Sequence, residues 1–289
     1  MRLNLFPGLS HRVRMFKKAR RLAAARRDLA GRVTQGSAWP ARPHGLPRHI
    51  VLSVTSYPAR FEGLAQTLLS LLFQTVRPDV TVLWIAHADL DRLPPEVRDL
   101  ARFGLEIRGC DDILSFKKII PTLEAFPDSI VVTADDDIYY WPSWFEELVA
   151  AHASGHAVVC HRAHLVRCGP DGMPLGYRDW ISAPERAVTG PQVFPTGVMG
   201  VLYDPRAFHP EVTRRDLFMA LCPRADDVWL WWMHRLRGSR PHLLGLGHKQ
   251  IEWPGSQDSN LRSLNMHEGG NDAAIAAMIA HYGFPADGE

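Results

Sequence analysis

The sequence lacks a long apolar run. No stretch of the 289 residues approaches the roughly 18 consecutive apolar side chains that a membrane-spanning helix needs. Residues 1–21 also lack the uninterrupted apolar centre and the small-residue cleavage site of a secretory signal peptide. We therefore expect a chain that does not span the membrane and stays in the cytoplasm.

Cysteine is scarce as well. The chain contains four cysteines, Cys110, Cys160, Cys168 and Cys222, and no CxxC pair. A chain of this length can bury a core without cross-links, so we expect free thiols in a reducing compartment. His161 and His164 lie between Cys160 and Cys168, but this spacing matches no usual zinc module. A zinc site is therefore the weaker alternative to the alternation of a β-strand.

Acidic residues are nearly absent from the first 48 positions. This segment holds 12 of the 33 basic residues and one of the 31 acidic residues, Asp28, so its formal charge is +11 and that of the rest is −9. Such a separation of charge is typical of a basic arm that contacts an anionic surface, either a membrane or a nucleic acid.

The basic arm is predicted to be a helix. Ser10 to Val33 is rich in Ala, Leu, Arg and Lys, and Ser10 can cap the first turn. One face carries small and apolar side chains that include Val13 and Phe16, and the other face is basic. This pattern favours a helix that lies on an anionic membrane. The alternatives are a solvated tail and a nucleic-acid arm, and no nucleic-acid module follows to support the latter.

The expected domain organisation has three parts. Residues 1–35 form the arm, residues 36–48, which contain Pro and Gly, form a linker, and residues 49–289 form the folded body. Within the body, strand patterns occur at 49–58, 79–88, 105–110 and 129–134, with helical patterns between them at 61–75, 94–104 and 115–127. This alternation predicts an α/β fold with a mostly parallel central sheet flanked by helices. Further strands are expected at 156–166 and 193–205, and further helices at 144–154 and 225–238.

Three carboxylates follow the fourth predicted strand, in "IVVTADDDI". Ligands of parallel sheets bind beyond the carboxyl ends of the strands, which is where Asp135, Asp136 and Asp137 lie. Clustered carboxylates become favourable around a hard cation such as Mg²⁺ or Mn²⁺. In extended backbone Asp135 and Asp137 point the same way, toward the metal, and Asp136 points away, toward a ribose or a backbone amide. The alternative is a polar turn that caps the helix expected at Trp144.

Three motifs in order along the chain resemble one enzyme family. "VLSVTSYPARFEGLAQTLLSLLFQT" resembles the opening strand and helix of nucleotide-sugar glycosyltransferases of the GT-A fold, particularly the family-two-like group. "TADDDI" matches the DxD motif of that fold, and "ADDVW" resembles the acidic motif that supplies the catalytic base in inverting members. The resemblance covers residues 49–272 and is closest to bacterial enzymes of surface-polysaccharide loci.

The resemblance implies a nucleotide-diphospho-sugar donor, with a UDP-sugar favoured, and a glycan or lipid-linked acceptor. Asp135 and Asp137 would hold Mn²⁺ or Mg²⁺ on the diphosphate, and His267, in "NMHEGGND", is a candidate third ligand. The residues expected to bind the donor are Ser53, Thr55, Tyr57, Arg60, Asp89, Lys117, Lys118 and Asp136. The family's usual Arg-Asn pair before the metal strand is replaced here by "FKK".

Asp226 and Asp227 are the candidates for the catalytic base. A sugar hydroxyl that attacks an anomeric carbon must lose its proton, and a carboxylate within hydrogen-bond reach can accept it. The metal would stabilise the departing diphosphate, so one carboxylate is enough for the base chemistry. The alternative is structural, because the pair begins a predicted helix, where acidic residues cap the first turn and interact favourably with the helix dipole.

Two other classes of protein remain possible from the sequence. A sugar nucleotidyltransferase usually opens with a Gly-rich phosphate loop, which "SVTSYPARF" lacks. A non-catalytic nucleotide-sugar-binding protein would not need both the Asp triplet and the Asp pair. The sequence therefore predicts a metal-dependent glycosyltransferase that inverts the anomeric configuration. We expect it to act at the inner face of the plasma membrane.

Overall fold

The computed structural model describes residues 7–245, 247–254 and 270–285. The helices are α1 (Pro7–Gln35), α2 (Phe61–Leu72), α3 (Pro95–Arg98), α4 (Ile120–Ala125), α5 (Trp144–Ala153), α6 (Arg215–Leu221), α7 (Asp226–Leu236) and α9 (Gly270–Tyr282). The main sheet contains, in spatial order, β10 (Val188–Thr189), β13 (His242–Leu243), β7 (Val158–Cys160), β12 (Val201–Tyr203), β6 (Ile130–Ala134), β2 (Ile50–Thr55), β4 (Val80–Ala86) and β5 (Leu105–Cys110). Two small sheets pair β1 (Arg42–Pro43) with β3 (Val76–Arg77), and β8 (Ala163–Leu165) with β9 (Ile181–Ser182) and β11 (Val193–Pro195).

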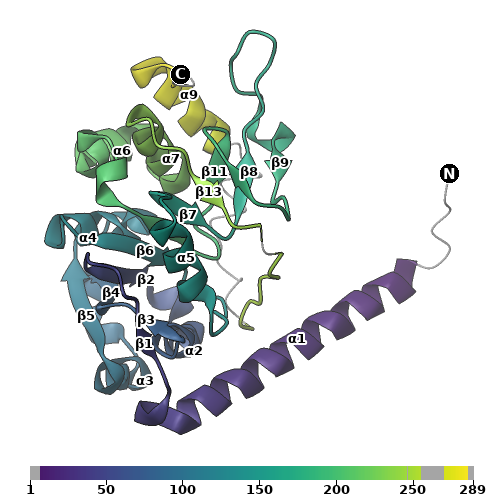
Figure 1. Cartoon of the computed structure of the whole chain (residues 1–289), viewed down its shortest axis with the longest axis vertical. Coiled ribbons are helices and arrows are strands. Elements are labelled where there is room, and N and C mark those ends of the chain that lie inside the picture. Colours follow the sequence, from purple (N-terminus) through teal and green to yellow (C-terminus); the bar gives the residue numbers. More distant parts are fainter. Residues whose placement is uncertain (1–6, 246, 255–269, 286–289) are drawn as a thin grey trace.

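The parallel half of the main sheet is as predicted. β6, β2, β4 and β5 run parallel, and Val54 of β2 pairs with Ala134 of β6. Figure 1 shows this sheet in the body of the molecule with helices packed around it. The arrangement is a mixed α/β, Rossmann-like fold, and it brings the carboxyl ends of β2 and β6 to the same edge. Asp135 is therefore the first residue after β6 and lies beside the end of β2.

The antiparallel half differs from the prediction, because each of the two later strands is broken in its middle. β7 and β12 pair within the main sheet, whereas β8 and β11 pair within a separate sheet. The first predicted strand is broken between Cys160, where β7 ends, and Ala163, where β8 begins. The second is broken between Pro195, where β11 ends, and Val201, where β12 begins. Gly200 has φ of 89°, and a Cβ there would lie 2.4 Å from the Trp144 ring, so this bend requires glycine.

Apolar side chains pack on both faces of the main sheet. Val131 of β6 belongs to one buried cluster and its neighbour Val132 to another, as expected when successive side chains point to opposite faces. The first cluster includes the three tryptophans of α7, Trp229, Trp231 and Trp232, each of which is at most 1% exposed. These tryptophans are therefore core residues, and two helices that the sequence did not reveal, α6 and α9, cover them.

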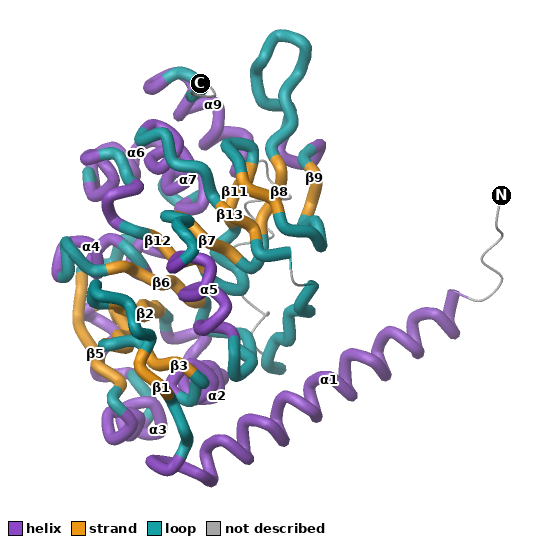
Figure 2. Tube along the Cα trace, in the orientation of Figure 1, coloured by secondary structure: helices purple, strands orange, loops and turns teal. Residues whose placement is uncertain are grey.

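The N-terminal helix has two different halves. Its inner half packs on the body, where Ala25 and Leu29 are buried against Tyr139 and Trp253. Figure 2 shows the rest of α1 continuing away from the body as one straight helix. Among the residues that the structure describes, no helix is long and apolar enough to cross a membrane.

The segment 36–48, expected to be a linker, also contacts the body. β1 in this segment pairs with β3, and the Trp39 indole nitrogen donates a hydrogen bond of 2.8 Å to the Gln74 carbonyl oxygen. The inner half of α1 and this segment therefore extend the packed body toward the N-terminus.

Candidate active site

A cavity of about 490 Å³ lies beyond the carboxyl ends of the parallel strands. The predicted site residues that line it are Thr55, Tyr57, Arg60, Lys117, Lys118, Asp135, Asp136, Asp137, Asp226 and Asp227. They come from the ends of β2 and β6, from the 3₁₀ turn Leu114–Lys118 and from the start of α7. The fold therefore brings together the Asp triplet and the Asp pair, which are far apart in the sequence.

The Asp triplet is held by two cations. Asp136 accepts hydrogen bonds from Ser56 Oγ at 2.6 Å and from Arg60 Nη1 at 2.7 Å. Arg60 Nη1 also lies 3.2 Å from Asp137 Oδ2, and Lys118 Nζ lies 3.5 Å from Asp135 Oδ1. The chain leaves the strand conformation at Ala134, so the predicted alternation, with Asp136 pointing away, does not hold: all three carboxylates line the cavity.

In this part of the site, burial and neighbouring charges have opposite effects on the pKa values of Asp136 and Arg60. Burial raises the pKa of Asp136, and the charge of Arg60 and the Ser56 hydroxyl limit that rise. The pKa of Arg60 is held above its ordinary value, since Asp136 and Asp137 together outweigh the burial that would lower it. Arg60 is therefore a fixed positive charge beside the triplet.

Lys118 links the two acidic groups. Its Nζ lies 3.0 Å from Asp226 Oδ2 as well as near Asp135. Burial acts to lower the pKa of Lys118, but Asp226, Asp135 and Asp227 outweigh it and raise this pKa well above its ordinary value. The ammonium group is thus a charged bridge between the end of β6 and the start of α7.

The Asp pair does not cap α7. The residue before the helix is Ala225, and no side-chain capping bond forms there. Instead Asp226 accepts a hydrogen bond of 2.9 Å from Ser115 Oγ, and Asp227 accepts one of 2.9 Å from the Gly197 backbone nitrogen. Burial, together with the charge of Asp226, raises the pKa of Asp227 from 3.8 to about 7, against the opposing effect of Lys118. Asp227 is therefore poised to exchange a proton near neutral pH.

Gly197 is needed for this close packing. A Cβ at this position would lie 2.5 Å from Lys118 Nζ and 3.2 Å from Asp227 Oδ1. The structure places Gly197 at the break between β11 and β12, where its backbone approaches both charged side chains.

Three of the predicted site residues are not part of the described cavity. The side chain of Ser53 is buried inside the sheet, 2.7 Å from Thr122 Oγ1, because its position in β2 faces the core. Asp89 follows β4 in a 3₁₀ turn and forms an ion pair with Arg92. His267 lies outside the described residues. The cavity thus gives no support to donor contacts from Ser53 or Asp89.

Several residues that line the cavity were not predicted. Ser56 follows β2 directly, so the strand-end rule that selected Thr55 and Tyr57 also applies to it. The cavity is also lined by Arg162, His164 and, farther along the sequence, Tyr177. They reach it because β8 leaves the main sheet, which no local pattern in the sequence indicated.

The described residues fit a metal ion that is shared with a ligand. Within the described ranges, no three His, Cys, Asp or Glu side chains are grouped so as to hold a metal ion by themselves. Asp135 and Asp137 supply two carboxylates to the wall of the cavity. Mg²⁺ is commonly bound by one or two carboxylates together with substrate phosphates and water. The donor set thus suits Mg²⁺ or Mn²⁺ bound together with a diphosphate.

The zinc alternative finds no support. None of the four cysteines, all within the described ranges, forms a disulfide, and Cys160 is fully buried within β7. His161 Nε2 donates a hydrogen bond of 3.0 Å to the Trp144 carbonyl oxygen, and His164 lies in β8, in a different sheet from Cys160.

Comparison with known proteins gives limited information. No protein-family model matches the chain, and no curated protein matches it. Among solved structures it is similar to 4-diphosphocytidyl-2C-methyl-D-erythritol synthase from Anaerococcus prevotii, with a TM-score of 0.34 and 12% identity. The match covers 60% of this chain and 76% of that chain. A TM-score this low is too weak to assign a family.

The raised pKa of Asp227 predicts a pH dependence of stability. Between about pH 4 and pH 7 the folded chain keeps a proton that the unfolded chain releases, so this contribution to stability is lost as the pH rises through about 7. The Asp227→Asn variant should lack this loss. Relative to wild type, it should gain about 2–3 kcal/mol in the free energy of unfolding between pH 5 and pH 8.

Urea unfolding at both pH values measures this difference. Asp91→Asn, at an exposed position, is the control and should follow wild type. Equal pH slopes for wild type and Asp227→Asn would show that Asp227 has an ordinary pKa.

Proposed function

We propose that this protein is a GT-A-type glycosyltransferase that moves a sugar from a nucleoside-diphospho-sugar, with UDP-sugars favoured, to a glycan or lipid-linked acceptor. The observation that carries the proposal is the position of Lys118 between Asp135 and Asp226 within one cavity. Sugar transfer requires groups that bind the diphosphate and a group that acts as base, and both must lie in the same cavity.

The donor would occupy the side of the cavity formed by the ends of β2 and β6. Thr55 and Tyr57 lie where a nucleotide binds in a parallel sheet, beyond the carboxyl end of the strand. Arg60 and Lys118 supply positive charge for a diphosphate. Mn²⁺ or Mg²⁺ held by Asp135 and Asp137 would stabilise the negative charge of the departing diphosphate.

Asp227 is the proposed catalytic base. Its pKa near 7 suits removal of a proton from an acceptor hydroxyl at physiological pH. Asp226 is engaged by both Ser115 and Lys118, so its part is to keep Lys118 in place and to raise the pKa of Asp227. A single base beside a metal-bound leaving group fits direct displacement, which inverts the anomeric configuration.

A sugar nucleotidyltransferase is the second candidate, because the same cavity at the carboxyl ends of the parallel strands could hold a nucleotide. Against this class, the connection from β2 to α2 contains no glycine between Ser56 and Phe61. Products separate the two classes: a glycosyltransferase releases a nucleoside diphosphate, and a nucleotidyltransferase releases pyrophosphate from a nucleoside triphosphate. A non-catalytic binding protein would release neither.

The outer half of α1 is proposed to bind an anionic membrane. Val13, Met15 and Phe16 are 46%, 51% and 68% exposed, and Lys17 and Arg20 border them. Apolar side chains beside basic ones favour a reversible contact with an anionic lipid surface. An acceptor carried on a lipid of the inner leaflet, as in bacterial surface-polysaccharide synthesis, would be within reach of an enzyme held there.

A donor screen by calorimetry tests the function. One nucleotide sugar, with UDP-sugars tried first, should bind with Mn²⁺ and much more weakly without it. Asp135→Ala and Asp137→Ala should abolish the metal dependence while leaving the fold intact. Asp89→Ala, which removes a half-buried carboxylate outside the cavity, is the matched control and should bind as wild type does. Equal affinity with and without metal would refute the metal assignment, and no binding of any nucleotide sugar would refute the function.

The role of Asp227 is tested by turnover. Asp227→Asn should lower kcat by about 10²–10⁴-fold and leave donor affinity nearly unchanged, since a base acts in the transition state. Asp226→Asn should lower kcat and also weaken donor binding, because it releases Lys118. NMR of the product should show the inverted anomer. A retained configuration, or full turnover in Asp227→Asn, would contradict this mechanism.

Vesicle co-sedimentation tests the membrane contact. Phe16→Asp should weaken binding to anionic vesicles by about tenfold, because it removes an exposed apolar side chain and adds repulsion worth about 1 kcal/mol per charge. Ile181→Asp, at a position 50% exposed on the body, should bind as wild type. Substitution is preferable to deletion of residues 1–35, because the inner half of α1 is part of the packed body. Equal binding of all three proteins would exclude this surface.

A further inference from the structure

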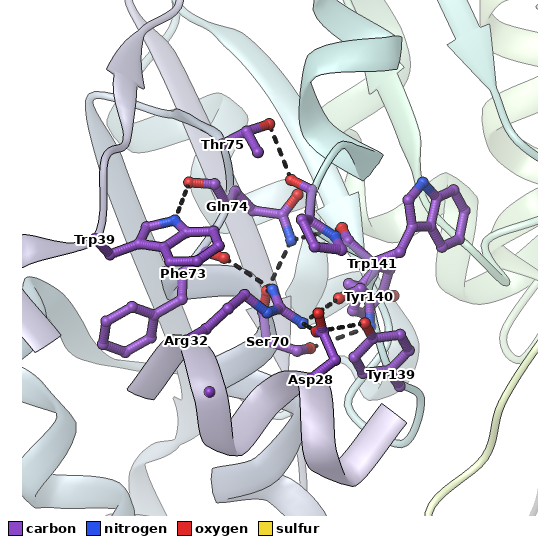
Figure 3. Close-up of polar contacts among 12 residues, drawn as sticks. Asp28, Arg32, Trp39, Ser70, Phe73, Gln74, Thr75, Tyr139, Tyr140 and Trp141 are labelled. Carbon is purple, nitrogen blue, oxygen red and sulfur yellow. Dashed lines mark hydrogen bonds and ion pairs between the residues drawn. The ribbon is translucent and has the colours of Figure 1, made fainter. Parts of the chain in front are cut away.

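Arg32 of α1 is buried in the body. Its side chain is among the largest that are fully buried, with the whole residue 1% exposed. Figure 3 shows its guanidinium directed at the end of α2 and at the segment after the Asp triplet. It donates hydrogen bonds to the carbonyl oxygens of Phe73 at 2.8 Å, Ser70 at 3.2 Å and Tyr140 at 3.1 Å. One side chain of α1 thus ties α2 to the chain that leaves β6.

Asp28, one turn before Arg32, completes this contact. Its carboxylate lies 2.8 Å from Arg32 Nη2 and accepts a hydrogen bond of 2.7 Å from Tyr139 Oη. The Arg32 guanidinium also lies 5.4 Å from the centre of the Tyr139 ring. The charge of Arg32 is therefore balanced inside the contact, and both tyrosines that follow the Asp triplet are held.

Tyr140 carries this support to the first carboxylate of the site. Its hydroxyl oxygen accepts a hydrogen bond of 2.7 Å from the Asp135 backbone nitrogen, and its own backbone nitrogen donates to Ser70 Oγ at 3.1 Å. The ring is fully buried, and burial raises the pKa of the hydroxyl well above its ordinary value, so it stays neutral. A continuous set of hydrogen bonds thus runs from Arg32 through Tyr140 to Asp135.

We propose that Arg32 and Asp28 are positioning residues for the segment Asp135–Asp137. They touch no ligand; they fix Tyr140, and Tyr140 fixes the backbone of Asp135. The inference deepens the proposed function, because it gives α1 a part in ordering the carboxylates that would bind the metal and the diphosphate. Partners of metal ligands of this kind typically change metal affinity by about 10–100-fold when they are lost.

The first test measures local order and needs no ligand. Hydrogen exchange, read by mass spectrometry on peptides that cover residues 130–141, should become faster in Arg32→Met and in Tyr140→Phe. Arg32→Lys keeps the charge but lacks the planar guanidinium group that reaches all three carbonyl oxygens. Its exchange rate should therefore lie between those of wild type and Arg32→Met. Arg98→Met is the matched control: it removes side-chain hydrogen bonds to the carbonyl oxygens of Leu93 and Leu90, away from this segment, and it should leave these peptides unchanged.

The second test measures the affinity for UDP with Mn²⁺ by calorimetry, beside the melting temperature. Arg32→Met and Tyr140→Phe should bind about 10–100-fold more weakly than wild type, and Arg98→Met should bind normally even where its melting temperature falls as far. Tyr140→Phe removes one hydroxyl only, so it decides the matter if Arg32→Met does not fold.

The outcomes separate this inference from the proposed function. Unchanged exchange over residues 130–141 in Tyr140→Phe and Arg32→Lys would overturn the positioning role, whether or not nucleotide binds. Failure of wild type to bind any nucleotide with Mn²⁺ would overturn the proposed function, and the exchange experiment would still decide the role of Arg32.

Discussion

The site depends on the crowding of five carboxylates around two cations, the ammonium group of Lys118 and the guanidinium group of Arg60. Asp135, Asp136, Asp137, Asp226 and Asp227 line the same cavity, and burying so many acids is costly unless each is paired or protonated. Lys118 and Arg60 contact the carboxylates directly, and the pKa of Asp227 is raised to about 7. Burial, together with this excess of negative charge, raises the pKa of Asp227, and the same excess of charge would favour a divalent cation.

This crowding sets requirements on the surrounding backbone. A Cβ at position 197 would crowd both Lys118 and Asp227, so this position, where the chain leaves one sheet for another, is occupied by glycine. The break between β11 and β12 therefore serves two purposes. It brings the Gly197 amide to Asp227, and on the partner strands it turns Arg162 and His164 toward the cavity.

What the sequence predicted, and what it did not, follows from the range of the interactions. The parallel strands and the Asp triplet were predictable, because apolar strands, turn residues and a strand-end position are local signals. Ser53 was misplaced because it lies within β2, two residues before the strand ends at Thr55, and is buried there. The broken strands and the burial of Arg32 depend on partners that are distant in the sequence, and a basic, helix-favouring segment gives no sign of them.

The charge of the arm must be divided between two tasks. Asp28, the single acid among the first 48 residues, pairs with Arg32 inside the body and so does not oppose a membrane contact. Arg42 and Arg48 pair with Glu146 and Asp204 of the body, and Lys18 lies 3.1 Å from Glu252, which lines the cavity. The formal charge of +11 therefore overstates what a lipid surface would meet. The helix α1 is continuous from an exposed outer end to a buried inner end. A membrane contact at the outer end would therefore be made by the same helix whose inner end holds Tyr140, the residue that contacts Asp135.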